Sequence, residues 1–121
     1  MEPGQNNNPQ QYLPLTVPVF HILLALADDE KHGYAIMREV EKSTAGGVSM
    51  GPGTLYGAIK RLLKAGLIAE TADRPDPALD DARRRYYKLT PLGRDVLAAE
   101  TERLLAMVDS ARRKNVLGGA A

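Results

Sequence analysis

The chain has 121 residues, 44% of them hydrophobic, and a formal net charge of +1. This length suits one domain with a buried core, and the near-neutral charge means that any signal for nucleic acid must come from where the charges lie. Because the chain contains no cysteine, disulfides and cysteine-based metal sites are excluded, and a reducing cytoplasm is the expected location. The longest apolar run, residues 17–27, is interrupted by Pro18 and His21 and is too short to span a bilayer, so we expect no membrane partner.

The first 14 residues are polar and do not begin with a basic region followed by an apolar one, so they are unlike a secretory signal. Their composition predicts a flexible arm over residues 1–14. The next segment carries Thr16, a typical N-cap, and predicts a helix that ends near Asp28. A second helix is expected to begin at His32 and to end at Gly46–Gly47.

A third helix, from about Pro52 to Ala65, divides into two faces at helical spacing. The apolar face consists of Leu55, Ala58, Ile59, Leu62 and Leu63. The other side carries Thr54, Tyr56, Gly57, Lys60, Arg61 and Lys64. Glycine at position 57 costs roughly 1 kcal/mol of helix propensity relative to alanine, which favours close backbone approach by a partner. These two faces are typical of a DNA-recognition helix, whose apolar side packs and whose basic side contacts DNA.

Two strand-like runs, residues 67–73 and 83–89, follow and are separated by prolines and aspartates that favour a turn. Thr90 then supplies an N-cap and Pro91 a first helical residue, which predicts a long helix to about Lys114. Three helices followed by a hairpin predict a mainly helical fold with a small β-hairpin, the winged helix-turn-helix. The expected boundaries are a flexible N-terminal arm at 1–14, a winged helix-turn-helix at 15–90, a dimerisation helix at 91–115 and a flexible tail at 116–121.

Several side chains of the third helix and the hairpin are candidate DNA contacts. Hydroxyl groups near the N-terminus of this helix, and the phenol of Tyr56, can join its basic residues in binding phosphate. On the second strand, alternation places Arg83 and Arg85 on one face, where guanidinium groups can bind phosphate in bidentate fashion. The alternative is that these arginines pair with nearby aspartates. The residues assigned to DNA on these grounds are Ser49, Thr54, Tyr56, Gly57, Lys60, Arg61, Lys64, Arg83 and Arg85.

The last helix carries more apolar surface than packing on a small domain requires. One stripe contains Leu92, Val96 and Ala99, and another, close to heptad spacing, contains Leu97, Leu104, Val108 and Ala111. The surplus predicts pairing with a second copy, and a continuous intramolecular core is the alternative. Two recognition helices about 34–36 Å apart would read a two-fold symmetric operator. The expected dimer interface is Leu13, Leu15, Phe20, Leu97, Leu104, Val108 and Ala111.

Sites for catalysis, metals or cofactors are not expected. The two histidines lie on different helices without a carboxylate cluster at metal-ligand spacing. The serines and threonines occupy caps and turns without a histidine and an aspartate to activate them, and Gly51-Pro52-Gly53 lacks the continuation of a phosphate-binding loop. The sequence therefore predicts a protein that is not an enzyme and binds no cofactor.

Several of these segments together resemble the PadR family of bacterial transcriptional regulators. The resemblance is carried by His-Gly-Tyr at 32–34, Gly-Thr-Leu-Tyr at 53–56, Lys-Arg-Leu at 60–62, Gly-Leu-Ile at 66–68, Arg-Tyr-Tyr-Lys-Leu-Thr at 85–90, and Gly93. It implies a homodimeric winged helix, usually a repressor, whose last helix supplies the dimer interface. One such helix follows the hairpin, as in the short branch of the family. In family terms, the residues at or near DNA are Tyr34, Thr54, Tyr56 and Lys60.

Some short members of the family bind flat aromatic compounds between the two protomers, stacked on tryptophan of the last helix, but this chain contains no tryptophan. A hypothetical pocket for a small hydrophobic or aromatic effector would be lined by Phe20, His21, Leu97, Leu104, Met107 and Val108. We therefore expect a dimeric repressor of double-stranded DNA that is relieved when an unknown ligand alters the spacing of its recognition helices. The rival hypothesis is a winged-helix scaffold that binds a protein partner through the same exposed helix.

Overall fold

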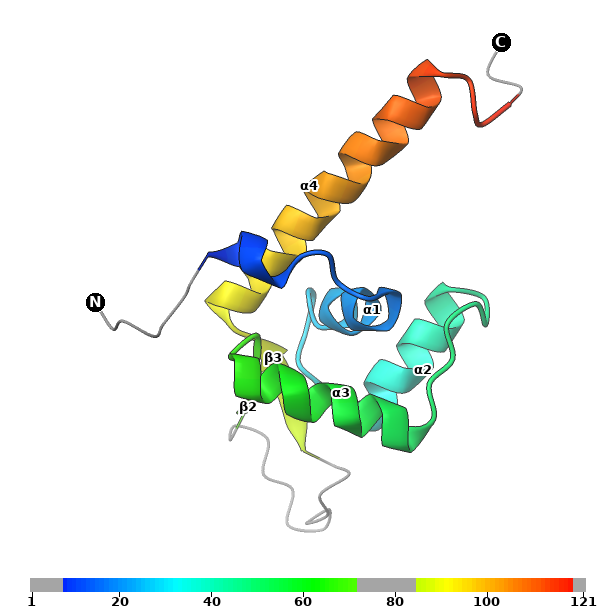
Figure 1. Ribbon diagram of the computed structural model, residues 1–121. Coiled ribbons are helices and arrows are strands. Elements are labelled where there is room, and N and C mark those ends of the chain that lie inside the picture. Colours follow the sequence, from blue (N-terminus) through cyan, green and yellow to red (C-terminus); the bar gives the residue numbers. More distant parts are fainter. Residues whose placement is uncertain (1–7, 72–84, 119–121) are drawn as a thin grey trace.

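The computed structural model describes residues 8–71 and 85–118. Helix α1 lies at the centre of the body, the small sheet lies at one edge beside α3, and the distal half of α4 extends away from this body (Figure 1). The elements in chain order are the 3-10 helix η1 (Pro9–Tyr12), α1 (Val17–Ala25), β1 (Lys31–His32), α2 (Gly33–Ser43), α3 (Pro52–Ala65), β2 (Ile68–Thr71), β3 (Tyr86–Leu89) and α4 (Pro91–Arg113). The predicted mainly helical fold with a small β-structure is confirmed.

The helix ends follow the capping residues that the sequence carries. The Thr16 hydroxyl accepts a hydrogen bond from the Val19 N–H at 3.3 Å and so begins α1. His32 caps α2 in the same way, because its Nδ1 accepts from the Ala35 N–H at 3.1 Å. Helix α3 ends at Ala65, and its C-cap, Gly66, has a φ of 80° in the left-handed region that favours glycine. The local sequence therefore sets where α1 and α2 begin and where α3 ends.

Two short elements were not predicted. Strand β1 pairs antiparallel with β3, which also pairs with β2, so the sheet has the order β1-β3-β2. The second is η1, which lies within residues 1–14, the segment expected to be a flexible arm. Asn8 caps η1 through a 3.1 Å hydrogen bond from the Gln10 N–H, and Tyr12 and Leu13 pack against the core. The polar composition was therefore a poor guide to this segment, because a few apolar side chains suffice to hold it on the body.

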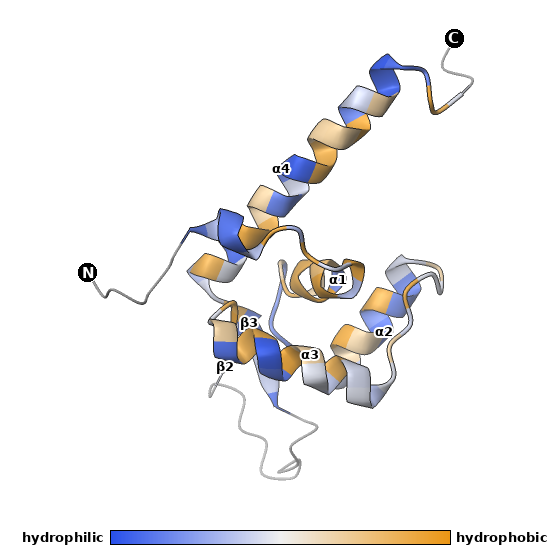
Figure 2. Cartoon of the chain, viewed as in Figure 1, coloured by the Kyte–Doolittle hydropathy of each residue, from blue (hydrophilic) through white to orange (hydrophobic). Residues whose placement is uncertain are grey.

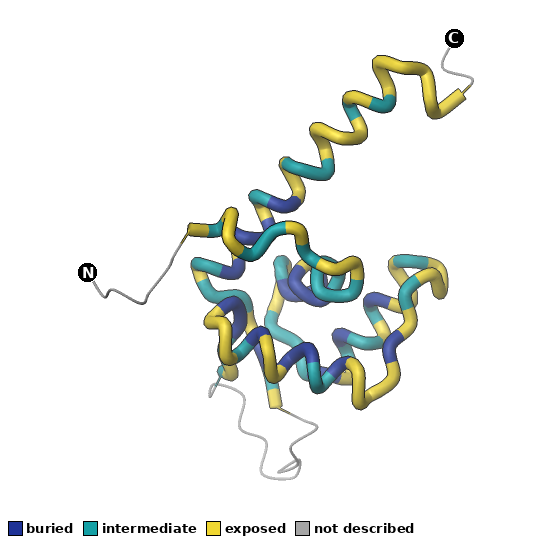
Figure 3. The backbone as a smooth tube through the Cα atoms, viewed as in Figure 1, coloured by how far each residue is buried: buried dark blue, intermediate teal, exposed yellow. Residues whose placement is uncertain are grey.

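The core lies where α1, α2 and α3 meet the sheet and the first half of α4. Helix α1 is apolar along most of its length (Figure 2), which explains why it lies at the centre of the body. Beyond position 100, α4 has no buried residue and is mostly exposed (Figure 3). None of the helices within the described ranges is long and apolar enough to cross a membrane. The fully buried core side chains are Ile22, Leu23, Ile36, Val40, Leu55, Ile59, Ile68 and Val96.

One buried charge fastens the N-terminal segment to α4. Glu100 is 1% exposed, and one of its carboxylate oxygens accepts a hydrogen bond from the Leu15 N–H at 2.9 Å. The Arg103 guanidinium donates to both carboxylate oxygens, at 2.6 and 2.9 Å. These bonds from Arg103 lower the pKa of Glu100 below its usual value, burial opposes the lowering, and the Leu15 N–H adds to it. The carboxylate is therefore held charged in the folded state.

Replacing Glu100 by glutamine should destabilise the fold and make it less sensitive to acid. The amide keeps the shape but loses the charge-assisted bonds to Arg103, so we expect a loss of roughly 1–2 kcal/mol at pH 7. Because the folded pKa is lowered, the wild-type contribution is present above the usual glutamate pKa of about 4.3 and is lost as the pH falls through the folded pKa. Urea unfolding at pH 7 and pH 3.5, at one protomer concentration, measures both effects. Glu102→Gln, an exposed position on the same helix, is the control, and an equal loss in both variants would contradict the role of Glu100.

Candidate nucleic-acid interface

Helix α3 presents the two faces that its sequence predicts. Leu55, Ala58, Ile59 and Leu62 are buried, and they pack the helix against α2 and β2. The basic side chains Lys60, Arg61 and Lys64 are all exposed. Helix α3 contains no acidic residue, so its outer surface carries positive charge only. This arrangement suits an anionic partner such as the phosphate backbone.

The N-terminal end of α3 adds polar groups to this surface. Ser49 and Thr54 are exposed, so both hydroxyls are accessible beside the first turn. Gly51 is the N-cap, and it supplies no side-chain hydrogen bond. Pro52, the first residue of α3, has no N–H, and the N-cap side chain makes no bond to the N–H groups of Gly53 and Thr54. An anion could therefore bind these two groups, and the helix dipole favours it there.

Tyr56 lies against α2. A Cβ added to Gly33 would lie 2.5 Å from the Tyr56 phenol oxygen and 2.7 Å from the ring carbon that bears it. Tyr56 is also half-buried and packs on the core. The structure therefore gives Tyr56 a packing role between α3 and α2, which the sequence analysis did not foresee, and its contact with DNA stays a prediction.

Gly57 has a different environment from Gly33. A Cβ at position 57 would meet only the Arg61 Nη1 at 3.7 Å, an ordinary contact distance. Alanine would therefore fit there within the folded chain, and it is also the better helix former. Neither packing nor helix propensity explains the glycine. This observation supports the prediction that glycine at position 57 serves an external partner.

Tyr34 and Arg38 form an exposed pair on the outer side of α2. Tyr34 is 54% exposed, and the Arg38 guanidinium carbon lies 5.6 Å from the centre of its ring, within the range of a cation–π contact. Sequence reasoning missed Arg38, although its i, i+4 spacing from Tyr34 was the available signal. A shallow hollow beside it is lined by Arg38, Glu39, Glu41 and Lys42, and these opposite charges make it a weaker anion site than α3.

Arg85, which directly precedes β3, is exposed but has an acidic neighbour. Its Nη1 lies 3.1 Å from a carboxylate oxygen of Glu70 on β2. The Arg85 and Glu70 side chains are 58% and 42% exposed, so this pair contributes little to stability, and phosphate can compete for the guanidinium. Arg83 and the aspartates that were considered as its partners lie outside the described residues.

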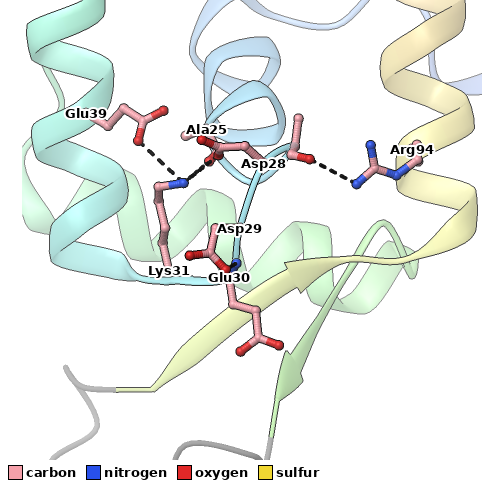
Figure 4. A network of polar contacts seen from close by, with 8 residues as sticks. Ala25, Asp28, Asp29, Glu30, Lys31, Glu39 and Arg94 are labelled. Atoms are coloured by element: carbon pink, nitrogen blue, oxygen red, sulfur yellow. Dashed lines mark hydrogen bonds and ion pairs between the residues drawn. The ribbon is translucent and has the colours of Figure 1, made fainter.

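A second polar network holds α1, β1 and α2 together and does not belong to the outer face of α3 (Figure 4). The Lys31 ammonium donates to the Ala25 carbonyl oxygen at 2.6 Å and to Asp28 at 2.7 Å, and it lies 3.5 Å from Glu39. Burial alone would lower the pKa of Lys31, but Asp28 and Glu39 raise it above its usual value. The Lys31 hydrogen bond in turn lowers the pKa of Asp28. This network joins the end of α1 to α2 through β1.

The residues expected at a dimer interface fall into two groups. Leu97 is only 7% exposed and belongs to the core of its own protomer, which differs from the expectation that it faces a second copy. Leu104 and Ala111 are partly exposed, and Val108 is 42% exposed. Leu13, Leu15 and Phe20 are half-buried against the core. The available apolar surface therefore lies on the distal half of α4 rather than along all of it.

The residues expected to line an effector pocket are likewise spread over different environments. Phe20 and His21 touch edge to face, with ring centres 5.6 Å apart. Met107, on the distal half of α4, is 51% exposed. Within residues 8–71 and 85–118, no group of three or more His, Asp or Glu side chains is placed to hold a metal ion.

Comparison with known proteins gives consistent matches. Residues 22–99 match the transcriptional regulator PadR-like family. The chain is 38% identical over 99 residues to the transcriptional regulator Rv3488 of Mycobacterium tuberculosis, covering 82% of this chain and 81% of that protein. It is also 40% identical over 79 residues to an uncharacterized 37.1 kDa protein in transposon TN4556 of Streptomyces fradiae. That match covers 65% of this chain but only 20% of the relative, so the chain spans about a fifth of its length.

Solved structures agree on the fold. A PadR family transcription regulator from Clostridium difficile R20291 superimposes with a TM-score of 0.66 at 22% identity, over 81% of this chain and 97% of that one. At this identity the match establishes the architecture alone, and it confirms the predicted winged helix.

Proposed function

The chain belongs to the PadR-like family of transcriptional regulators, and on this premise we propose that it binds a two-fold symmetric DNA operator as a homodimer and represses transcription. The observation that carries the proposal is the outer face of α3, where Lys60, Arg61 and Lys64 are exposed on a helix without acidic residues. In a winged helix-turn-helix this helix enters the major groove. Its basic side chains would contact phosphate and fix the register of the protein on DNA.

The distal half of α4 supports the dimer. Leu105, Met107 and Val108 are 54%, 51% and 42% exposed on a helix that extends away from the body. Contiguous exposed apolar side chains of this kind mark interaction surfaces. We assign the pairing face to Leu104, Val108 and Ala111, which share one side of α4, and the DNA-binding unit to residues 15–90.

A small effector would act between the two protomers. In the dimer, the aromatic pair Phe20 and His21 and the α4 residues Leu104, Met107 and Val108 would have to come together to form an apolar surface for a hydrophobic or aromatic compound. Such a ligand would relieve repression by altering the distance between the two α3 helices. Its identity is a separate question from DNA binding, and a ligand screen follows once an operator is known.

The test is selection of duplexes from a random library by the purified chain, followed by fluorescence anisotropy on the selected duplex with a shuffled duplex as competitor. A DNA regulator should prefer the selected duplex and lose affinity as salt rises. Failure to enrich any sequence would overturn the proposal and favour the rival hypothesis, a winged-helix scaffold for a protein partner.

Lys60→Ala should weaken binding to the selected and the shuffled duplex alike, by about tenfold or more at 0.1 M salt, because a phosphate contact carries no sequence information. Each dimer loses two contacts, so the slope of log K against log salt should fall by about 1.8. Lys114→Ala removes the same charge at the exposed end of α4 and is the matched control. Unchanged affinity in Lys60→Ala would reject the contact, and a loss confined to the selected duplex would indicate a base contact instead.

A further inference from the structure

Thr90, the N-cap of α4, makes three hydrogen bonds, two of which attach it to the residues that follow the proposed recognition helix. The Thr90 hydroxyl donates to the Gly66 carbonyl oxygen at 2.6 Å and accepts from the Gly93 N–H at 3.0 Å. The Thr90 N–H donates to the Leu67 carbonyl oxygen at 3.1 Å. A single threonine therefore both caps α4 and holds the turn that ends α3.

Gly93 brings the two backbones together at the same place. A Cβ added to Gly93 would overlap the Leu67 carbonyl oxygen and lie 2.9 Å from the carbonyl carbon. Both are backbone atoms, so no side-chain rotation could make room. The distance between α4 and the end of α3 therefore depends on glycine at this position.

The neighbouring residue extends the attachment to α1. Arg94 donates from Nη2 to the Ala27 carbonyl oxygen at 3.1 Å, as the dashed line in Figure 4 shows. The first turn of α4 is thus attached both to the end of α3 and to the turn after α1. We call this attachment, made by Thr90, Gly93 and Arg94, the joint. A rotation of α4 about the joint would have to break the hydrogen bonds of Thr90 and Arg94.

We propose that Thr90 and Gly93 are positioning residues that fix the angle between α3 and α4, and thereby the spacing of the two recognition helices in the dimer. This inference rests on the proposed function, in which α4 pairs the protomers and α3 reads DNA. Helix α3 has 14 residues and is about 21 Å long. A tilt of about 10° at its end would move its other end by about 4 Å, which exceeds the rise of about 3.4 Å per base pair. Small changes at the joint therefore alter which half-site spacing the dimer fits.

The first experiment compares Thr90→Val with Thr90→Ser. Valine keeps the branched shape but removes the hydroxyl that makes two of the bonds, whereas serine retains it. Affinities are measured for the selected duplex and for duplexes with one base pair added or removed between the half-sites. The discrimination is the ratio of the affinity for the selected duplex to the affinity for a duplex with altered spacing. We expect Thr90→Ser to keep the wild-type ratio and Thr90→Val to lower it at least fivefold. The affinity for a single half-site should stay unchanged within twofold in both variants. If Thr90→Val is less stable but discriminates like the wild type, Thr90 is only a structural cap and the inference is overturned.

The second experiment measures the spacing without DNA. The chain has no cysteine, so Gly53→Cys, whose Cβ would point into open space at the start of α3, accepts one spin label per protomer. The distance distribution between the two labels should be narrow in the wild-type background and with Thr90→Ser, and broader or shifted with Thr90→Val. Gly93→Ala should shift it further if that variant folds. Identical distributions in all backgrounds would overturn the inference.

Failure of the proposed function has a different signature. A wild-type chain that sediments as a monomer, or that enriches no duplex, overturns the dimeric DNA-binding function and the role of the joint with it. A wild-type chain that dimerises and discriminates spacing, beside a Thr90→Val variant that behaves identically, overturns the joint alone.

Discussion

Leu104→Asp should convert the proposed dimer into monomers and raise its Kd at least about 10³-fold. In a symmetric interface each substitution acts twice, so two unpaired carboxylates would have to be buried. Burial of the two carboxylates needs to weaken the free energy of dimerisation by only about 4 kcal/mol to produce this change in Kd, and buried unpaired charges commonly cost that much. Sedimentation velocity over a range of protein concentrations measures the effect.

Ala106→Asp is the matched control for this prediction. Ala106 is exposed and lies two residues from Leu104, on the opposite side of α4 at helical spacing. It introduces the same charge outside the assigned pairing face and should leave the dimer intact. A dimer that persists in Leu104→Asp but dissociates in Ala106→Asp would place the interface on the other side of the helix.

Raising the salt concentration from 50 to 200 mM should lower the affinity for DNA by about 10³-fold. Lys60, Arg61 and Lys64 occur once in each protomer, so a dimer would bring six basic side chains to the phosphates. Six neutralised phosphates predict a slope of about −5 for log K against log salt. Fluorescence anisotropy at several potassium chloride concentrations gives the slope directly.

The slope of log K against log salt also indicates how many basic residues of each protomer contact phosphate. A value near −2 would mean that only one basic residue per protomer contacts phosphate, and the assignment of the α3 face would then be wrong. A steeper value than expected would mean that further cations contact phosphate, and the exposed Arg38 and Arg85 are two candidates. The double variant Lys60→Ala, Lys64→Ala should flatten the slope by about 3.6 units.

Much of the fold could be predicted because its helices carry their own start and stop signals. Thr16 and Thr90 form the caps that their positions indicate, and α3 spans the expected residues, from Pro52 to Ala65. Strand β1 could not be predicted, because two residues show no periodicity and its strand character comes only from pairing with β3. Helix α1 ends at Ala25 rather than near Asp28, since the N–H groups of the next two residues bond to carbonyls three residues back.

The candidate site was predictable in its charges but not in its contacts. Helical spacing was enough to place Lys60 on the outer face of α3, because every residue of a helix has a fixed direction. The pairing of Arg85 with Glu70 depends on strand register, and the burial of Leu97 depends on how far α4 lies along the body. Both are tertiary properties, which the spacing of residues within one element does not contain.

The close approach of Gly33 to Tyr56 has a consequence for how sequences of this fold can vary. Because a Cβ at position 33 would collide with a side chain, a larger residue there becomes acceptable when position 56 shrinks, and the two positions should covary among homologues. Gly93 faces a backbone carbonyl instead, and a substitution that changes a neighbouring side chain cannot remove that carbonyl. Among homologues that share this fold, position 33 should therefore vary together with position 56, whereas position 93 should stay glycine whatever its neighbours are.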